Sequence, residues 1–158
     1  MTYAPETSPG HAAGVAALIG TRRLAEYSNW DSRGSLVRAF GPDPIGYIFF
    51  DQTGHFSVHI MRTPPVPPFA AGPENPTPSE AHELLQSYYG AFGTYDVDTA
   101  QSMIVFHVEG ATRPDFIGTD VRFPYRLAED SLIIGDEKTW RRIWVRAPEA
   151  ARGSHDAA

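Results

Sequence analysis

The chain has 158 residues, of which 42% are apolar and 20% are charged, and this composition predicts one globular domain over residues 1–158. Its formal net charge of −6 and the lack of a basic run argue against nucleic acid or an anionic membrane as the main partner. Because the sequence holds no cysteine, it excludes disulfides, a thiol nucleophile and a thiolate metal site.

The N-terminal part predicts a short helix followed by two strands. Residues 1–10 are rich in Pro, Ser and Thr and are expected to be flexible. This region lacks the basic start of a signal peptide, and the apolar run Val15–Ile19 is too short to span a bilayer, so we expect a cytoplasmic protein. The segments expected next are a helix at 12–19, a strand at 21–30, a turn at 31–34 and a strand at 35–40.

A β-hairpin is the clearest local signal in the sequence. Two segments with strand-like alternation, Ile45–Asp51 and His55–Arg62, flank Gln52-Thr53-Gly54, whose glycine suits the positive φ of a tight turn. The rigid turn Gly41-Pro42-Asp43-Pro44 precedes them. The second strand has two distinct faces, and either one could line the interior. One face holds His55, Ser57, His59 and Met61, and the other holds Phe56, Val58 and Ile60.

A proline-rich segment and a helix follow the hairpin. Residues 63–78 hold seven prolines, which remove too many N–H donors for regular structure, so we expect a stiff loop that serves as a lid. Thr77-Pro78-Ser79-Glu80 is a capping-box pattern and predicts a helix that runs to about Tyr89. Gly90 and Gly93 are expected to end this helix.

The rest of the chain predicts further strands, at 94–97, 103–109, 121–127, 131–134 and 139–146. Residues 147–158 are expected to form a flexible tail. Eight or nine antiparallel strands with short turns close most economically into an up-and-down barrel, because closure removes exposed sheet edges. The predicted fold class is therefore mainly β, an antiparallel β-barrel of about 8–9 strands with one α-helix near the barrel mouth.

Several short motifs stand in order along the chain: Gly41-Pro42-Asp43-Pro44-x-Gly46-Tyr47, Gly54-His55-x-Ser57-Val58 with Met61-Arg62, Tyr95-x-Val97-Asp98, His107-Val108-Glu109-Gly110, and Pro114-x-x-x-Gly118-Thr119-Asp120. Together they resemble the bacterial lipocalin-like domain family over roughly residues 18–146. The resemblance implies one small lipocalin-like barrel around a cavity. It also implies a class of activity, since some related small barrels act as cofactor-free cyclases or isomerases in natural-product pathways.

Three positions depart from the family pattern. Arg22 stands where lipocalins have the inward-pointing tryptophan of a G-x-W motif at the barrel floor, and Phe106 and Phe123 stand where a histidine and an arginine are common. The phase of that tryptophan implies that Arg22 and Glu26 both face the interior. Arg22 then either hydrogen-bonds neighbouring backbone at the floor or orients an anionic or carbonyl group of a ligand.

Several side chains are candidates for chemistry or binding. His59 is the best candidate for a base or donor, with a surface or structural histidine as the alternative reading. The aromatic faces of the later strands either line a lumen or fill a closed core. The candidate catalytic residues are Arg22, Glu26, His59 and Tyr125. The candidate ligand-binding residues are Tyr47, Phe49, Met61, Tyr88, Tyr95, Phe106, Phe123 and Trp144.

Two further patterns are interpreted first as structural. Trp140, Arg142 and Trp144 alternate on the last strand, as expected for an arginine that packs against an aromatic floor. His107 and Glu109 share a strand face, and we favour a solvated face over a base with its orienting group. Since neither this pair nor the hairpin histidines have the spacing of a metal site, no metal or other cofactor is expected.

These observations predict a cofactor-free isomerase or cyclase that holds a mostly apolar small molecule in a reactive shape. A non-catalytic binding or carrier protein that uses the same cavity is the alternative, and an interaction module with a filled barrel is a third possibility. The expected partner is a small-molecule ligand or substrate, with no nucleic acid and no membrane. The sequence leaves the oligomeric state open.

Overall fold

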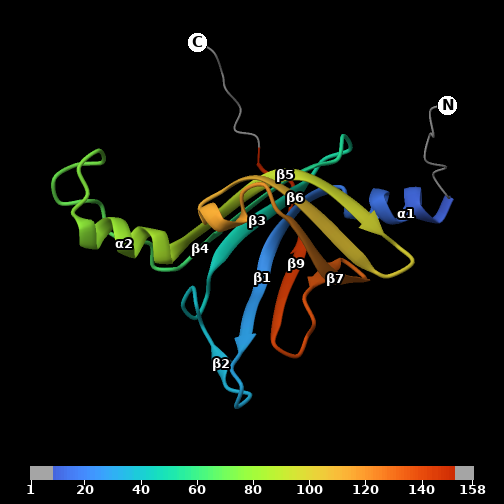
Figure 1. Ribbon diagram of the computed structural model, residues 1–158, viewed down its shortest axis with the longest axis horizontal. Coiled ribbons are helices and arrows are strands. Elements are labelled where there is room, and N and C mark those ends of the chain that lie inside the picture. Colours follow the sequence, from blue (N-terminus) through green and yellow to red (C-terminus); the bar gives the residue numbers. More distant parts are fainter. Residues whose placement is uncertain (1–8, 152–158) are drawn as a thin grey trace, which may run out of the picture.

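Alternating apolar and polar residues produce nine β-strands within residues 9–151, the part of the chain that a computed structural model describes. The strands follow the order β2-β1-β3-β4-β5-β6-β7-β8-β9, and the additional pairing of β1 with β9 closes a barrel (Figure 1). All pairings are antiparallel, and the predicted fold class is confirmed. The strands are β1 (Gly20–Trp30), β2 (Leu36–Val37), β3 (Ile45–Phe50), β4 (His55–Met61), β5 (Tyr88–Asp98), β6 (Met103–Ala111), β7 (Asp120–Ala128), β8 (Ser131–Ile134) and β9 (Trp140–Arg146), and the helices are α1 (Pro9–Leu18), α2 (Pro78–Ser87) and the short 3-10 helix η1 (Pro114–Phe116).

Strand β1 closes the barrel because it pairs on both sides. Its first residues, Gly20–Arg23, pair with β3, and residues Arg22–Asn29 pair with β9. The short strand β2 pairs only with the end of β1 and lies outside the closed ring. The predicted strand at 35–40 is therefore mostly loop. Only Leu36 and Val37 are in strand conformation, and they pair with the end of β1.

The predicted hairpin is confirmed by β3 and β4, with Tyr47 opposite His59 in the register. Gly54 adopts a φ of 87°, as the turn requires. The carboxylate of Asp51 accepts hydrogen bonds from the backbone N–H groups of Thr53 and His55, which fixes the turn. The structure also decides between the two faces of β4. The apolar face points into the barrel, with Phe56 5%, Val58 9% and Ile60 4% exposed.

The predicted helix stop at Gly90 and Gly93 is wrong, because both glycines lie inside strand β5. A Cβ on Gly93 would overlap the carbonyl oxygen of His107 on β6, so close contact between the two strands requires glycine there. Helix α2 already ends at Ser87, and the chain passes directly into the strand. In the sequence both glycines look like helix terminators, but Gly93 permits close contact between β5 and β6, and the atoms nearest to a Cβ on Gly90 belong to side chains.

Helix α2 begins as predicted, with the Thr77 hydroxyl accepting from the Glu80 N–H and the Glu80 carboxylate accepting from the Thr77 N–H. The helix and the preceding segment 63–78 project from one side of the barrel (Figure 1). Leu84 and Leu85 on α2 are each 43% exposed. No residue of 63–78 lines the barrel cavity described below, so the segment does not cover it, contrary to the prediction of a lid.

The described N-terminal residues form a longer helix than predicted. Helix α1 begins at Pro9 instead of residue 12 and packs its C-terminal end on the barrel through Leu18, which is fully buried. Of the tails expected at 1–10 and 147–158, residues 1–8 and 152–158 lie outside the described residues. Neither of the two α-helices described has the length and apolar character needed to cross a bilayer.

A histidine on the outer surface links three neighbouring strands. His107 Nδ1 lies 2.6 Å from Asp120 Oδ1, and its Nε2 lies 2.8 Å from Asp96 Oδ2. Hydrogen bonds with Asp120 and then Asp96 raise the pKa of His107 above its ordinary value of 6.5, and burial opposes them only in part. This arrangement stabilises the protonated imidazole in the folded state.

This histidine makes stability dependent on pH. Because its folded pKa is raised, its contribution is complete below about pH 6.5 and is lost as the pH rises through the raised pKa. We expect His107→Gln to remove that decline from urea-unfolding curves recorded between about pH 5.5 and 8.5. His82→Gln, on exposed α2, is the matched control and retains the decline. A decline that survives in His107→Gln contradicts this assignment.

Candidate functional site

The barrel encloses a cavity of about 460 Å³. This volume lies within the range of small-molecule sites, which is roughly 300–1,000 Å³. Its exposed lining residues are Ala39, Gln86 and Phe116, so the cavity opens where the end of α2 and η1 meet the segment around Phe40. Its walls come from strands on all sides of the barrel. The lining residues are Tyr27, Ala39, Phe40, Ile48, Phe56, Val58, Ile60, Gln86, Tyr89, Ala91, Phe106, Val108, Arg113, Phe116, Val121, Phe123, Ile134, Trp140, Arg142 and Trp144.

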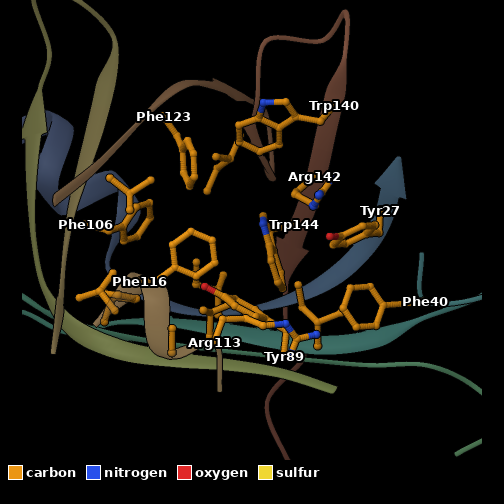
Figure 2. A pocket seen from close by; sticks show the side chains of 18 of the residues that line it. Tyr27, Phe40, Tyr89, Phe106, Arg113, Phe116, Phe123, Trp140, Arg142 and Trp144 are labelled. Atoms are coloured by element: carbon orange, nitrogen blue, oxygen red, sulfur yellow. The ribbon is translucent and has the colours of Figure 1, made fainter. Parts of the chain in front are cut away.

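Aromatic rings form the inner wall of the cavity (Figure 2). Phe106 packs edge-on against Phe56 with ring centroids 4.7 Å apart, and Phe123 packs edge-on against Trp140 at the same distance. These contacts hold the rings at defined angles, so the wall is rigid as well as apolar. Phe106 and Phe123, the two aromatic departures from the family pattern, therefore both line the cavity.

Arg142 brings a positive charge to the cavity wall. Its guanidinium carbon lies 3.2 Å from the centroid of the Tyr27 ring and 5.2 Å from that of Trp140, and its Nη1 donates to the carbonyl oxygen of Ser28 at 2.8 Å. Burial lowers the pKa of Arg142, while the neighbouring Tyr27 acts in the opposite direction. The stacking and the carbonyl contact fix this guanidinium in place.

Arg113 brings a second positive charge, from the loop between β6 and η1. Its Nη1 is buried without a hydrogen-bond partner in residues 9–151. Tyr89 also lines the cavity, and its ring packs edge-on against that of Phe116 with the ring centroids 6.5 Å apart. Burial raises the pKa of Tyr89, the nearby Tyr27 adds to the rise, and Arg113 opposes it. Two arginines and two tyrosines thus supply the hydroxyl and guanidinium groups of the cavity.

A β-bulge explains why Tyr27 faces the cavity and Glu26 does not. The register of β1 against β9 shifts between Leu24 and Glu26, so Ala25 is an extra residue and the inward phase changes. Glu26 therefore points away from the lumen and accepts hydrogen bonds from Ser28 Oγ and Arg141 Nη2, each at 2.7 Å. Burial alone would raise the pKa of Glu26, but these hydrogen bonds outweigh it and lower the pKa. The expected interior position of Glu26 is wrong.

Arg22 lies at the barrel floor and does not line the cavity. It is 2% exposed, and its Nη2 donates to the carbonyl oxygen of Ala17 in α1 at 2.8 Å. Its Nη1 lies 3.4 Å from the carbonyl oxygen of Asp130. Burial, followed by the nearby Arg146, lowers the pKa of Arg22 to about 10. Of the two roles considered for Arg22, the backbone contacts correspond to the structural one.

His59 lies on the outer face of β4, away from the cavity. Its Nε2 is 2.8 Å from Ser57 Oγ and its Nδ1 is 2.6 Å from the hydroxyl of Tyr88. Four predicted ligand-binding residues lie outside with it, because β3, β4 and the start of β5 turn the alternate residues, such as Ile48, Val58 and Tyr89, toward the cavity. They are Tyr47, Phe49, Met61 and Tyr88. The prediction that His59 reaches a bound ligand is wrong for this cavity.

The remaining predicted residues divide between core and cavity. Tyr95 is 5% exposed, and its hydroxyl donates a hydrogen bond to the Asp51 carbonyl oxygen. Tyr125 is half-buried and packs against the core. Neither residue lines the cavity. Phe106, Phe123 and Trp144 do line it. The structure therefore brings together three of the predicted residues. Within residues 9–151, no three histidine, aspartate or glutamate side chains are placed to hold a metal ion.

Sequence reasoning missed the two tyrosines and the two arginines that line the cavity. They are Tyr27, Tyr89, Arg113 and Arg142. Only Arg142 had a usable signal, since it alternates with Trp140 and Trp144 on β9. The other three depend on the bulge in β1, on the early start of β5 and on a loop, none of which the residue pattern indicated.

Comparison with known proteins gives a family match and a structural neighbour. The family model for a lipocalin-like domain matches residues 19–151. Solved structures also match, and one is a mutant of the fluorescent protein UnaG, at 16% identity and a TM-score of 0.37, over 84% of this chain and 98% of that chain. No curated protein matches the sequence. With the family match extending over most of its length, the chain belongs to the lipocalin-like domain family.

Proposed function

We propose that the protein binds a mostly apolar small molecule inside the barrel. The observation that carries this proposal is the cavity of about 460 Å³, whose walls are largely aromatic and aliphatic with a few polar groups. This combination is the usual character of a small-molecule site, because apolar walls provide affinity and sparse polar groups provide orientation. An interaction module with a filled barrel is not favoured, since the interior is hollow.

The chemistry of the walls favours binding without catalysis as the leading function. No histidine, aspartate or glutamate occurs among the residues that line the cavity in the described part of the chain. A conventional general base is therefore not available to a ligand held there. A binding or carrier role requires no such group.

A cofactor-free isomerase or cyclase is the second candidate, and the presence of both Tyr89 and Arg113 in the cavity wall favours it. A phenol and a guanidinium in an apolar cavity stabilise negative charge that develops on a substrate oxygen. Isomerisation and cyclisation of this kind leave the molecular formula of the substrate unchanged, so no co-reactant is required. The walls would additionally hold the substrate in a folded, reactive shape.

The binding proposal is tested with the neutral apolar probe N-phenyl-1-naphthylamine. We expect titration to change the tryptophan fluorescence, because Trp140 and Trp144 line the cavity and Trp30 does not. Val121→Phe adds volume at the wall and is expected to weaken binding about tenfold. Trp30→Phe is the matched control and retains both the response and the affinity. Absence of saturable binding contradicts the proposal.

The two candidate functions are then separated by turnover. Each compound that binds is incubated with the protein and compared by chromatography and mass spectrometry before and after. Recovery of the unchanged compound supports a carrier, and recovery of an isomer of identical mass supports the isomerase or cyclase.

A further inference from the structure

We propose that the ligand is an apolar carboxylic acid and that Arg113 binds its carboxylate. This inference rests on the proposed function, because it names the class of molecule that the same cavity accepts. It follows from three observations: an arginine without a partner, a lining without negative charge, and the position of that arginine across the cavity from Phe123 and Trp140.

Arg113 differs from every other arginine that is buried or half-buried in residues 9–151. Arg62 pairs with Glu83, and Arg141 pairs with Glu26. Arg22 and Arg142 donate to backbone carbonyl oxygens. Arg113 alone makes no side-chain hydrogen bond or ion pair within the described chain, and its buried Nη1 has no acceptor. A buried N–H without an acceptor is costly, so a group that supplies one gains binding free energy there.

The lining offers donors and lacks anionic acceptors. Its charged side chains are Arg113 and Arg142, and no acidic side chain of the described chain reaches it. The indole Nε1 of Trp144 is also buried without an acceptor in residues 9–151. The cavity is therefore positive although the whole chain carries a net charge of −6. Low-dielectric walls strengthen such a field, which favours an anion over a neutral or cationic guest.

The positions of the two arginines indicate which one receives the carboxylate. Arg142 already stacks on Tyr27 and donates to the Ser28 carbonyl oxygen. The Arg113 side chain, in contrast, donates to no acceptor in the described residues. Arg113 and Tyr89 lie on the side of the cavity opposite Phe123 and Trp140 (Figure 2). Arg113 also lies beside η1 and near the opening. The arrangement orients the acid with its carboxylate at the mouth and its apolar body against the aromatic wall. A planar guanidinium suits a carboxylate because the two form parallel hydrogen bonds.

The test compares an acid with its neutral ester. cis-Parinaric acid and its methyl ester are titrated into the protein, and binding is followed by energy transfer from tryptophan. We expect the protein to bind the acid about tenfold or more tightly than the ester, since hydrogen bonds between charged groups are stronger than those between neutral groups. Arg113→Gln is expected to lose that preference and to keep the affinity for the ester, which also shows that the variant is folded.

Two further variants complete the design. Arg126→Gln, which removes an outer-surface arginine paired with Glu137, is the matched control and leaves both affinities unchanged. Arg113→Lys keeps the positive charge but lacks the planar guanidinium, so we expect it to retain part of the preference for the acid that Arg113→Gln loses. Equal affinities for acid and ester in the unmodified protein, or a preference that survives Arg113→Gln, overturn this inference and leave the proposed function standing. Failure of both compounds to bind overturns the inference and, together with a negative result for the neutral probe, the proposed function.

Discussion

Gly93→Ala is expected to lower the free energy of unfolding by about 2–4 kcal/mol. Gly93 is buried in β5 next to a shift in register against β6, and a new Cβ would overlap the carbonyl oxygen of His107. Since backbone atoms on both strands are tied into the barrel ladder, neither can move away without breaking hydrogen bonds. The measurement is guanidinium unfolding followed by tryptophan fluorescence.

The same substitution on the neighbouring strand provides the control. In Gly110→Ala, the atoms nearest to the new Cβ belong to the ring of Phe92, a side chain that is 55% exposed and free to turn away. We expect this variant to lose less than about 1 kcal/mol. If the two variants are equally destabilised, the loss comes from the general strand environment and not from the contact between β5 and β6.

Arg22→Ala is expected to destabilise the protein by about 2–4 kcal/mol, mainly because it leaves a cavity at the barrel floor. The side chain is almost fully buried and links α1 to the barrel through the Ala17 carbonyl. Both carbonyl oxygens that Arg22 contacts also accept hydrogen bonds from Arg146. These oxygens therefore stay hydrogen-bonded when Arg22 is replaced by an uncharged residue. Arg22→Met, which fills a similar volume, is therefore expected to stay within about 1.5 kcal/mol of the unmodified protein.

Arg23→Ala is the matched control for this series. It changes the same residue type on the opposite, exposed face of β1, and we expect a loss below about 0.5 kcal/mol. Ligand affinity provides the second measurement. Because Arg22 does not line the cavity, Arg22→Met should bind the probes as the unmodified protein does. A variant that stays stable but loses binding would return Arg22 to the list of ligand contacts.

The fold was predictable where local chemistry and tertiary structure favour the same element. The hairpin from Ile45 to Arg62 and the strand at 131–134 have strict boundaries in the residue pattern, and the capping box begins α2 at the expected residue. Prediction failed for β5, because a glycine such as Gly93 has the same local signature whether it ends a helix or permits strands to approach. Only the contact with β6 distinguishes the two cases.

The site was predictable only in its apolar part. Phe106 and Phe123 belong to regular strands whose inward phase follows from simple alternation, so their place on the wall could be expected. His59 and the aromatic side chains of β3 share a strand pattern in which both faces contain large residues, and the residue types alone do not assign the interior. Arg113 lies in a loop, where no periodicity indicates which way a side chain points.

The bulge at Ala25 allows β1 to gain or lose one residue without a change in the chemistry of the cavity wall. Ala25 has no partner on β9, and the residues on either side of it oppose the consecutive residues Trp144 and Ile143. Deleting Ala25 would therefore straighten the strand and leave the phenol of Tyr27 facing the lumen and the carboxylate of Glu26 outside. Related barrels can thus differ in length at this point of β1 and still present the same wall to a ligand.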